Sequence, residues 1–313
     1  MRLGNTSNSI WSLIAFDCVL AILLTAAFTA HAQDIEPRAY ANTPVGLNFL
    51  IAGYGYTGGG VAFDPVLPIE NAEVKVDSVI FAYARSLDVL GKSAKFDVVL
   101  PYAWVDGSAT ALGQFRDREI SGFADPRMRF SINLLGAPAL SLKEFANYQQ
   151  DLILGASVNV TAPGGQYDAT KLLNIGTNRW SIKPEIGISK RIGQLTLELD
   201  GGVRFYTDND QFFGDSIRAQ GPIYSVQGHV IYSFGHGIWF AVDGTYYTGG
   251  QTTVNNIEDN NRQANSRIGA TVALPVNQYN SIKLYFSKGL TTRIGSDFDA
   301  AGIYWQFLFG EGF

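Results

Sequence analysis

After residue 32, apolar and polar positions alternate along the chain in about a dozen segments. Within 194–207, Leu195 and Leu197 have one parity, whereas Glu198 and Asp200 have the other. A period of two residues is typical of a β-strand whose two faces meet different surroundings. We therefore predict twelve strands, near 44–56, 72–86, 94–105, 123–135, 150–162, 179–190, 194–207, 219–233, 237–249, 265–275, 280–291 and 299–309.

The connections between these segments are short and long in turn. Tight turns include 190–193, 234–237 and 275–278, and every long loop follows an odd-numbered strand. Outer-membrane barrels keep short turns on the periplasmic side and long loops outside. The chain is therefore predicted to be all-β, a transmembrane antiparallel β-barrel with both termini in the periplasm. The predicted external loops are 58–71, 106–121, 163–178, 208–218, 250–264 and 293–297.

One connection that should be periplasmic, 136–149, is nevertheless long. Ser141 and Glu144 have the spacing of a capping box, in which two side chains satisfy backbone N–H groups of the first helical turn. We predict a short amphipathic helix over 141–148 at the periplasmic rim. Its simpler role is to cover the end of the barrel. The alternative is that it gates the lumen or docks a partner.

Residues 1–32 are typical of a cleaved signal peptide. Arg2 precedes an apolar stretch, 10–28, and Ala30-His31-Ala32 supplies the small residues of a cleavage site. The alternative is a retained anchor helix, for which this stretch is near the lower length limit. The predicted mature domain is the barrel, 33–313. Cys18 is the only cysteine, so this barrel would contain no disulfide and no thiolate metal site.

The composition favours a membrane barrel over a soluble domain. Charged residues make up 16% of the chain and hydrophobic residues 46%, with 15 Tyr and 20 Phe. Soluble domains ordinarily contain about 25% charged residues. No mature stretch is apolar over the roughly 18 residues that a spanning helix needs. The net charge is −5 without a basic stripe, so nucleic acid is not an expected partner.

Aromatic residues gather near the ends of the predicted strands, where their rings can meet both lipid tails and water. We predict interfacial girdles rather than a ligand cage. The final strand carries Ile303, Trp305 and Phe307 on one face, and the chain ends in Phe313. Barrel assembly machinery reads an ending of this type, so this machinery and outer-membrane lipids are expected partners. The girdle residues are Tyr54, Tyr56, Tyr102, Trp104, Trp180, Phe205, Tyr206, Trp239, Tyr246 and Tyr247.

If the apolar parity faces lipid, the other parity lines the lumen, because a charge at the bilayer midplane costs about 2–4 kcal/mol. The inward set contains six basic and five acidic side chains. Such a balance favours cross-linked charges in a narrow interior over a strongly ion-selective pore. The inward residues are Asp97, Arg127, Arg129, Lys183, Glu185, Glu198, Asp200, Arg204, Asp243, Arg267 and Lys283, with Gln227, His229, Thr271, Tyr304 and Gln306.

The mature chain offers little for catalysis, because its histidines are His229 and His236 alone. His236 lies in a predicted periplasmic turn, and His229 faces inward by parity. An outer-membrane lipid hydrolase, the least favoured alternative, needs its His and Ser at the lipid-facing surface. We therefore predict no enzyme. The acidic loops 208–210 and 258–261 lack the spacing of a calcium loop, and neither a metal nor a cofactor is expected.

Residues 122–190 resemble a family of Gram-negative outer-membrane proteins named for the MetA-pathway of phenol degradation. The resemblance is carried by 123–129, 136–145, 161–168 and 174–187. It implies an outer-membrane barrel that handles aromatic or other hydrophobic compounds as a passive channel, and it brings no catalytic residues. Within this stretch, Asn174 and Asn178 are expected to brace the loop 163–178 over the mouth.

We therefore expect a channel that passively admits small, hydrophobic or aromatic solutes across the outer membrane of a Gram-negative bacterium. Charged side chains of the lumen would orient the polar ends of these solutes, while Tyr and Phe rings contact their apolar parts. The alternative is a structural or adhesive barrel whose lumen is plugged by its own side chains. The predicted solute path comprises Arg127, Arg129, Lys183, Glu185, Arg204 and Arg267.

Overall fold

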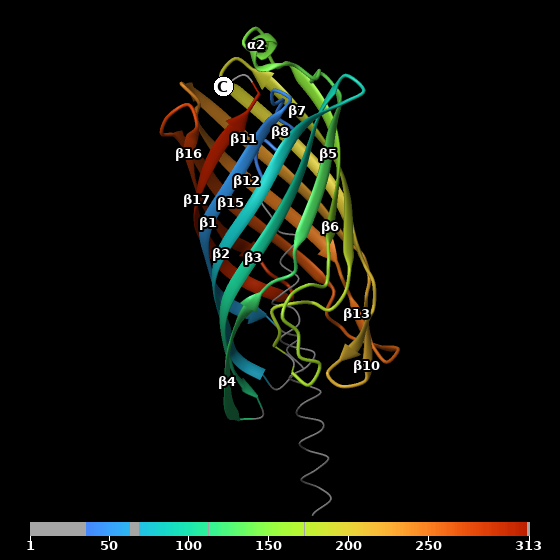
Figure 1. Cartoon of the computed structure of the whole chain (residues 1–313). Helices are drawn as coiled ribbons and strands as arrows, with labels where there is room; N and C mark the ends of the chain where they lie inside the picture. Colours follow the sequence, from blue (N-terminus) through green and yellow to red (C-terminus); the bar gives the residue numbers. More distant parts are fainter. Residues whose placement is uncertain (1–35, 63–68, 112, 172, 312–313) are drawn as a thin grey trace, which may run out of the picture.

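The computed structural model describes residues 36–62, 69–111, 113–171 and 173–311, so the predicted signal peptide, 1–32, lies outside the described residues. The described chain forms a closed antiparallel barrel of twelve strand positions (Figure 1). β1 pairs with both β2 and β17, which closes the ring. The barrel strands are β1 Leu47–Ala62, β2 Ile69–Val89, β3 Lys92–Ala111, β4 Gln114–Phe123, β5 Arg127–Leu135, β6 Leu152–Thr161, β7 Ser181–Ile192, β8 Leu195–Tyr206, β11 Ile223–Gly235, β12 Ile238–Gly249, β15 Gln263–Pro275, β16 Asn280–Thr291 and β17 Gly295–Gly310.

β4 and β5 together fill one strand position. β4 pairs with the outer part of β3, and β5 pairs with its inner part. The three residues between them include Pro126, which has no N–H to donate to a ladder. Asp125 instead accepts hydrogen bonds from the backbone N–H groups of Gly165 and Thr177, at 2.9 and 2.8 Å. The wall is therefore interrupted here and joined to the loop 163–178.

Two of the predicted external loops are wrong. The described parts of these loops, 58–62, 69–71, 106–111 and 113–121, largely extend the strands β1 to β4 beyond the membrane, and the β3–β4 ladder runs to the pair Ala111–Gln114. The glycines at 58–60 and the mixed charges of β4 carry no apolar face. Outside the lipid both faces of a strand meet water, so the ladder continues where the period-two pattern stops.

The predicted loops 208–218 and 250–264 also contain regular structure. They supply a four-stranded external sheet in the order β14-β13-β10-β9, which lies at the end opposite α2 (Figure 1). Its strands are β9 Asn209–Phe212, β10 Ser216–Gln220, β13 Thr252–Val254 and β14 Ile257–Glu258. The described part of the loop 163–178 contains no strand. Its predicted bracing is confirmed: the Asn174 amide donates to the Asp168 carbonyl, and the Asn178 amide donates to Asn209.

The predicted periplasmic helix is confirmed as one turn, α2 Leu142–Phe145. Its capping box is complete, because Ser141 Oγ accepts from the Glu144 N–H and Glu144 Oε2 accepts from the Ser141 N–H, at 3.3 and 2.9 Å. Among the described residues, no helix has the length and apolarity needed to cross a bilayer.

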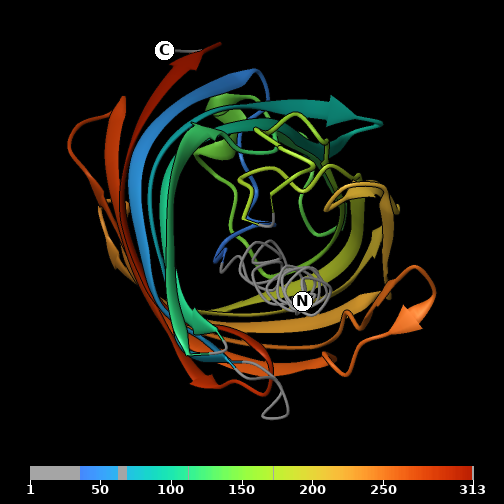
Figure 2. The ribbon, with the colours of Figure 1, turned by 90° about the horizontal axis from the view of Figure 1, so that it is seen from below.

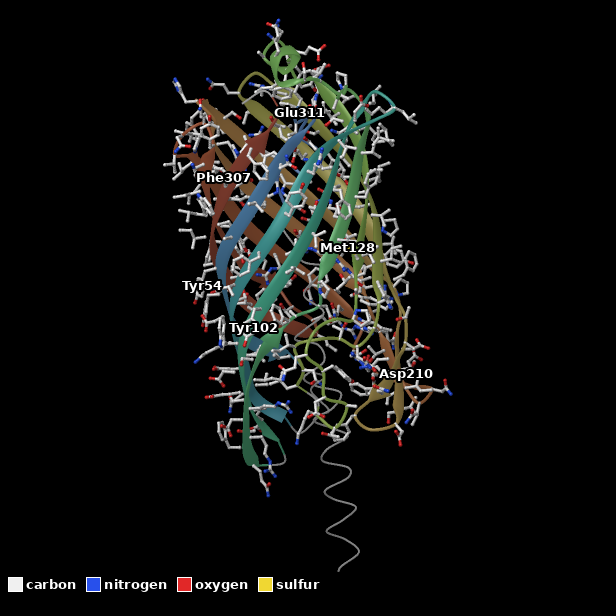
Figure 3. The ribbon with its side chains drawn as sticks, viewed as in Figure 1. Tyr54, Tyr102, Met128, Asp210, Phe307 and Glu311 are labelled. Atoms are coloured by element: carbon white, nitrogen blue, oxygen red, sulfur yellow. The ribbon has the colours of Figure 1, made fainter. Side chains whose placement is uncertain are left out.

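The strand parities are those predicted. Leu195, Leu197 and Leu199 are 41–54% exposed on the outer face, whereas Glu198 and Asp200 are buried inside. Tyr54 and Tyr102 lie toward the end that carries β10, and Phe307 lies toward the end that carries α2 (Figure 3).

Three of the predicted girdle residues face inward instead. Tyr206 packs on the buried pair Ile223 and Tyr247, and Trp239 is buried beside Ile231. Alternation along the strand explains the error, because Tyr246 and Tyr247 are neighbours and only one of them can meet lipid.

Candidate functional site

The N-terminal segment, residues 36–46, lies inside the barrel, where it is seen in blue along the barrel axis (Figure 2). Tyr40 is its central contact and is 3% exposed. The ring packs against Gly155 and Gly187, which pair across β6 and β7. A Cβ at either glycine would lie about 2.1–2.2 Å from a ring carbon, so only glycine fits beneath the ring. The Tyr40 hydroxyl is 3.3 Å from Ser157 Oγ.

Charged groups of several strands hold the same segment. Glu36 forms an ion pair with Arg129 of β5. The backbone N–H of Arg38 donates to the Glu198 carboxylate of β8 at 2.7 Å. The Lys95 ammonium of β3 donates to the Ala39 carbonyl at 2.9 Å. Burial alone would raise the pKa of Glu36. Nearby positive charges outweigh this effect and lower the pKa; they belong to Arg129, Lys283, Lys95 and Lys183. Glu36 is therefore bound as a carboxylate.

The periplasmic end of the segment is tied to the connection that precedes α2. The Asn42 amide donates to the Pro138 carbonyl at 3.2 Å, and the Val45 N–H donates to the Leu140 carbonyl at 2.8 Å. Ser86 Oγ donates to the Pro44 carbonyl and accepts from the Leu47 N–H. The segment is thus anchored at both ends, to the wall at mid-barrel and to the rim at the periplasm.

Five of the six predicted path residues gather around the tip of this segment. Arg127, Lys183, Glu185 and Arg204 line a small polar pocket together with Glu36. Arg129 joins them through its ion pair with Glu36, and Lys183 pairs with Glu185. The pocket is polar on every side that these residues form. Its free volume is about 20 Å³, the space of one water molecule, so a solute group would enter only where Glu36 and Ala39 are displaced.

Arg267 does not join this group. Its guanidinium donates to Ser287 at 2.9 Å and lies 3.8 Å from the centre of the Phe298 ring. Its parity was predicted correctly, since it is 3% exposed, but its contacts lie within its own wall. The parity of a residue in its strand predicts which face of the wall its side chain lies on, but it does not predict which residues the side chain contacts.

Part of the wall is cross-linked, as the balance of charges suggested. His229 Nδ1 lies 2.7 Å from Asp243, and its Nε2 lies 3.4 Å from Asp200. Thr271 donates to the second oxygen of Asp243 at 3.1 Å. This cluster joins β8, β11, β12 and β15. His229 therefore faces the interior and not the lipid surface.

Sequence reasoning missed Glu36, Arg38 and Tyr40. They precede the first strand and show no period, so the sequence pattern assigns them no role in the predicted barrel domain. Two ionisable residues and a tyrosine close together between a cleavage site and a first strand were the available signal. Their partners are 93 residues away for Glu36 and 160 for Arg38, which no local pattern reveals.

The family model described as "Putative MetA-pathway of phenol degradation" matches residues 54–307. No curated protein sequence matches significantly. Among solved structures, the COG4313 outer membrane channel from Pseudomonas putida F1 superposes with a TM-score of 0.74 at 20% identity, covering 88% of this chain and 100% of that one.

Two autotransporter barrels are more distantly similar. The transport unit of AIDA-I from Escherichia coli has a TM-score of 0.52 at 8% identity, covering 93% of this chain and 98% of that one. The beta domain of Bordetella BrkA has a TM-score of 0.51 at 10% identity, covering 84% and 100%. At these identities the solved structures establish the barrel fold.

Proposed function

Because the chain belongs to the MetA-pathway of phenol degradation family, we propose that this barrel of the Gram-negative outer membrane is a channel that passively admits small hydrophobic or aromatic compounds. The observation that carries the proposal is the way the lumen is closed. Residues 36–46 occupy it as a separate segment outside the strand ladders, held at mid-barrel by side-chain contacts and at the rim also by backbone hydrogen bonds. Such a segment can move while every strand pair of the barrel stays intact.

The five gathered residues are the proposed inner part of the solute path. A molecule that reaches Arg127 and Arg204 from outside meets Glu36 next, because all three line the same pocket. Displacement of the segment would then continue the path to the periplasm. Arg267 is proposed only as part of the wall, because its contacts are to Ser287 and Phe298.

The competing function is a structural or adhesive barrel with a plugged lumen. The His229 cluster supports it for one side of the wall. The contact of the Tyr40 ring with Gly155 and Gly187 favours the channel. A lumen plugged permanently by side chains of the wall would not need two glycines where the ring of a separate segment packs. No geometry on the described residues supports an outer-membrane hydrolase at the lipid surface, since His229 is inward.

Uptake of N-phenyl-1-naphthylamine tests the proposal. This apolar aromatic probe fluoresces in membranes, and an intact outer membrane excludes it. Cells that lack their general porins and express the protein should take up the probe several-fold faster than vector controls. Vancomycin sensitivity should stay unchanged, because it reports general leakage. Equal uptake rates at equal amounts of folded, heat-modifiable barrel would reject the channel.

A further inference from the structure

Two arginines are buried at the external sheet, at the end of the lumen opposite the N-terminal segment. Arg179 precedes β7 and Arg218 belongs to β10, and they are 3% and 7% exposed. The Arg179 guanidinium lies 4.4 Å from the ring centre of Tyr206, and that of Arg218 lies 5.4 Å from the ring centre of Phe212. Aromatic rings therefore support both cations on their flat faces.

Within the described chain, neither arginine has a carboxylate at ion-pair distance. Two of the nearby acids are engaged elsewhere: Asp125 accepts from Gly165 and Thr177, and Asp259 accepts from Thr252 at 2.7 Å. Burial and, next to it, the positive charge of Arg179 together lower the pKa of Arg218 to about 9. Two positive charges are thus buried in each other's field without a paired counter-charge.

Hydrogen-bonding groups in the same place also lack partners. Arg179 Nη2 donates to Gln220, but Arg179 Nη1 has no acceptor among the described residues. The Tyr206 hydroxyl is likewise buried and unpartnered there. Buried polar groups almost always have a hydrogen-bond partner in folded proteins. A partner that accepts hydrogen bonds and carries negative charge, such as a carboxylate or sulfonate, would satisfy these donors and both cations together.

We propose that Arg179, Arg218 and Tyr206 form a binding site for the anionic group of an organic solute. The inference rests on the proposed channel function and names its solute class, which is an amphipathic anion. Phe212 lies under Arg218 and also belongs to a buried apolar cluster with Val105, Leu173 and Ile175. Phe213 and Val254 are only partly buried against this cluster, so the hydrophobic part of the solute packs on them while its anionic group binds the arginines.

The strand register continues this site into the lumen. Tyr206 pairs with Ser181, Ser181 with Thr161, and Thr161 with Arg127, so these residues form one row across four strands. Arg204 donates to Ser181 of this row at 3.2 Å, and Thr161 Oγ1 has no partner among the described residues. An anion that leaves the outer arginines therefore reaches Arg127 and Arg204 at the next step.

The row below shows where the anion would arrive. Arg129 pairs with Asn159, and Asn159 with Lys183, one inward-facing position further along each strand. There the carboxylate of Glu36 already binds Arg129. The protein thus places a carboxylate of its own at the inner end of a row of cations. A solute carboxylate competes with it for the same arginine.

Ion selectivity in planar bilayers tests the site with two aromatic ions of similar size, benzenesulfonate and phenyltrimethylammonium. Both are permanently charged, so neither crosses the lipid as a neutral form. Reversal potentials should show a preference for the anion. The double variant R179Q/R218Q should reduce this preference about tenfold. The matched double variant R262Q/R293Q removes two exposed external arginines and should leave the preference within about twofold of the original.

Tyr206→Phe removes one hydroxyl without changing charge or ring packing, and it keeps the test valid if the double variant fails to fold. It should weaken benzenesulfonate binding to the purified barrel by about three- to tenfold in calorimetry. Equal losses of preference in R179Q/R218Q and R262Q/R293Q would overturn the site in favour of general surface charge. Sulfate binding as tight as benzenesulfonate binding would overturn the assignment to organic solutes.

Uptake of the neutral naphthylamine probe separates the two proposals. If the probe enters and R179Q/R218Q leaves anion preference unchanged, the anion site is wrong and the channel stands. If neither the probe nor either aromatic ion enters, both the channel and the site fail.

Discussion

Tyr40 fits in the lumen because the two wall residues beneath its ring are glycines, which have no side chain. Gly155 and Gly187 leave a flat floor on paired strands, and the ring covers it. The hydrogen bond to Ser157, at 3.3 Å, is long, so the fit of ring against backbone is the main restraint. Adding a single Cβ at Gly155 or Gly187 would therefore displace the Tyr40 ring and, with it, the N-terminal segment.

We expect Gly155→Ala to displace residues 36–46, because its Cβ would lie 2.1 Å from the Tyr40 ring. Single-channel conductance should rise several-fold with the barrel still folded. Gly244→Ala is the matched control, since a Cβ there meets nothing within 4 Å. Tyr40→Ala should raise conductance similarly, and the double variant should show no further gain. Additive effects of the two substitutions would contradict a shared mechanism.

Glu36 predicts an acid response of the same segment. Its pKa is lowered while it binds Arg129, so its contribution to the closed state is complete above the ordinary Glu value of about 4.3. The contribution is lost as the pH falls through the lowered pKa. Conductance should therefore increase on acidification from about pH 5 to pH 3. Glu36→Gln should be more conductive at pH 7 and lose this response; an unchanged acid response in the variant would assign it to another group.

Whether an element could be predicted from the sequence depended on whether its pattern lies within a short stretch of the chain. Strands that cross the membrane were predictable, because lipid outside and water inside force a period of two on Leu195 to Asp200 and their counterparts. The α2 turn was predictable from Ser141 and Glu144, which lie three residues apart. The external sheet and residues 36–46 were not, since their partners are distant in the chain and their side chains answer to neither lipid nor a fixed period.

The connection 136–141 and the helix α2 should differ in importance. Pro138 and Leu140 hold the N-terminal segment through their carbonyls, whereas α2 has no buried residue. Replacing 138–140 with three glycines keeps these carbonyls but frees the backbone that positions them, so it should increase the open fraction in bilayer recordings. Uncapping the helix with S141A/E144A should leave it nearly unchanged. The reverse order would make α2 the gate and the connection a spacer.

At the scale of the whole molecule, the barrel separates two solvents. Its outer face carries leucine, valine and aromatic side chains, and its inner face carries most of the buried charges. Those charges would be costly in a soluble core of the same size, but here several of them are paired: Arg129 with Glu36, Lys183 with Glu185, and His229 with Asp243. The fold class and the inward residues followed from this division. The segment that occupies the lumen could not be predicted in this way, because an aqueous interior is compatible with any polar segment that fits.

The division itself predicts how stability responds to a charge on either face. Leu199 lies near the middle of β8 and is 54% exposed on the outer face, so Leu199→Lys places a charge in hydrocarbon. The cost near the midplane is about 2–4 kcal/mol of unfolding free energy. Leu199→Met, which keeps the side chain apolar, should cost less than about 1.5 kcal/mol. Urea unfolding in lipid vesicles, followed by tryptophan fluorescence, measures both values. Equal stabilities of the Lys and Met variants would mean that this face does not meet lipid, and the assignment of inside and outside would have to be reversed.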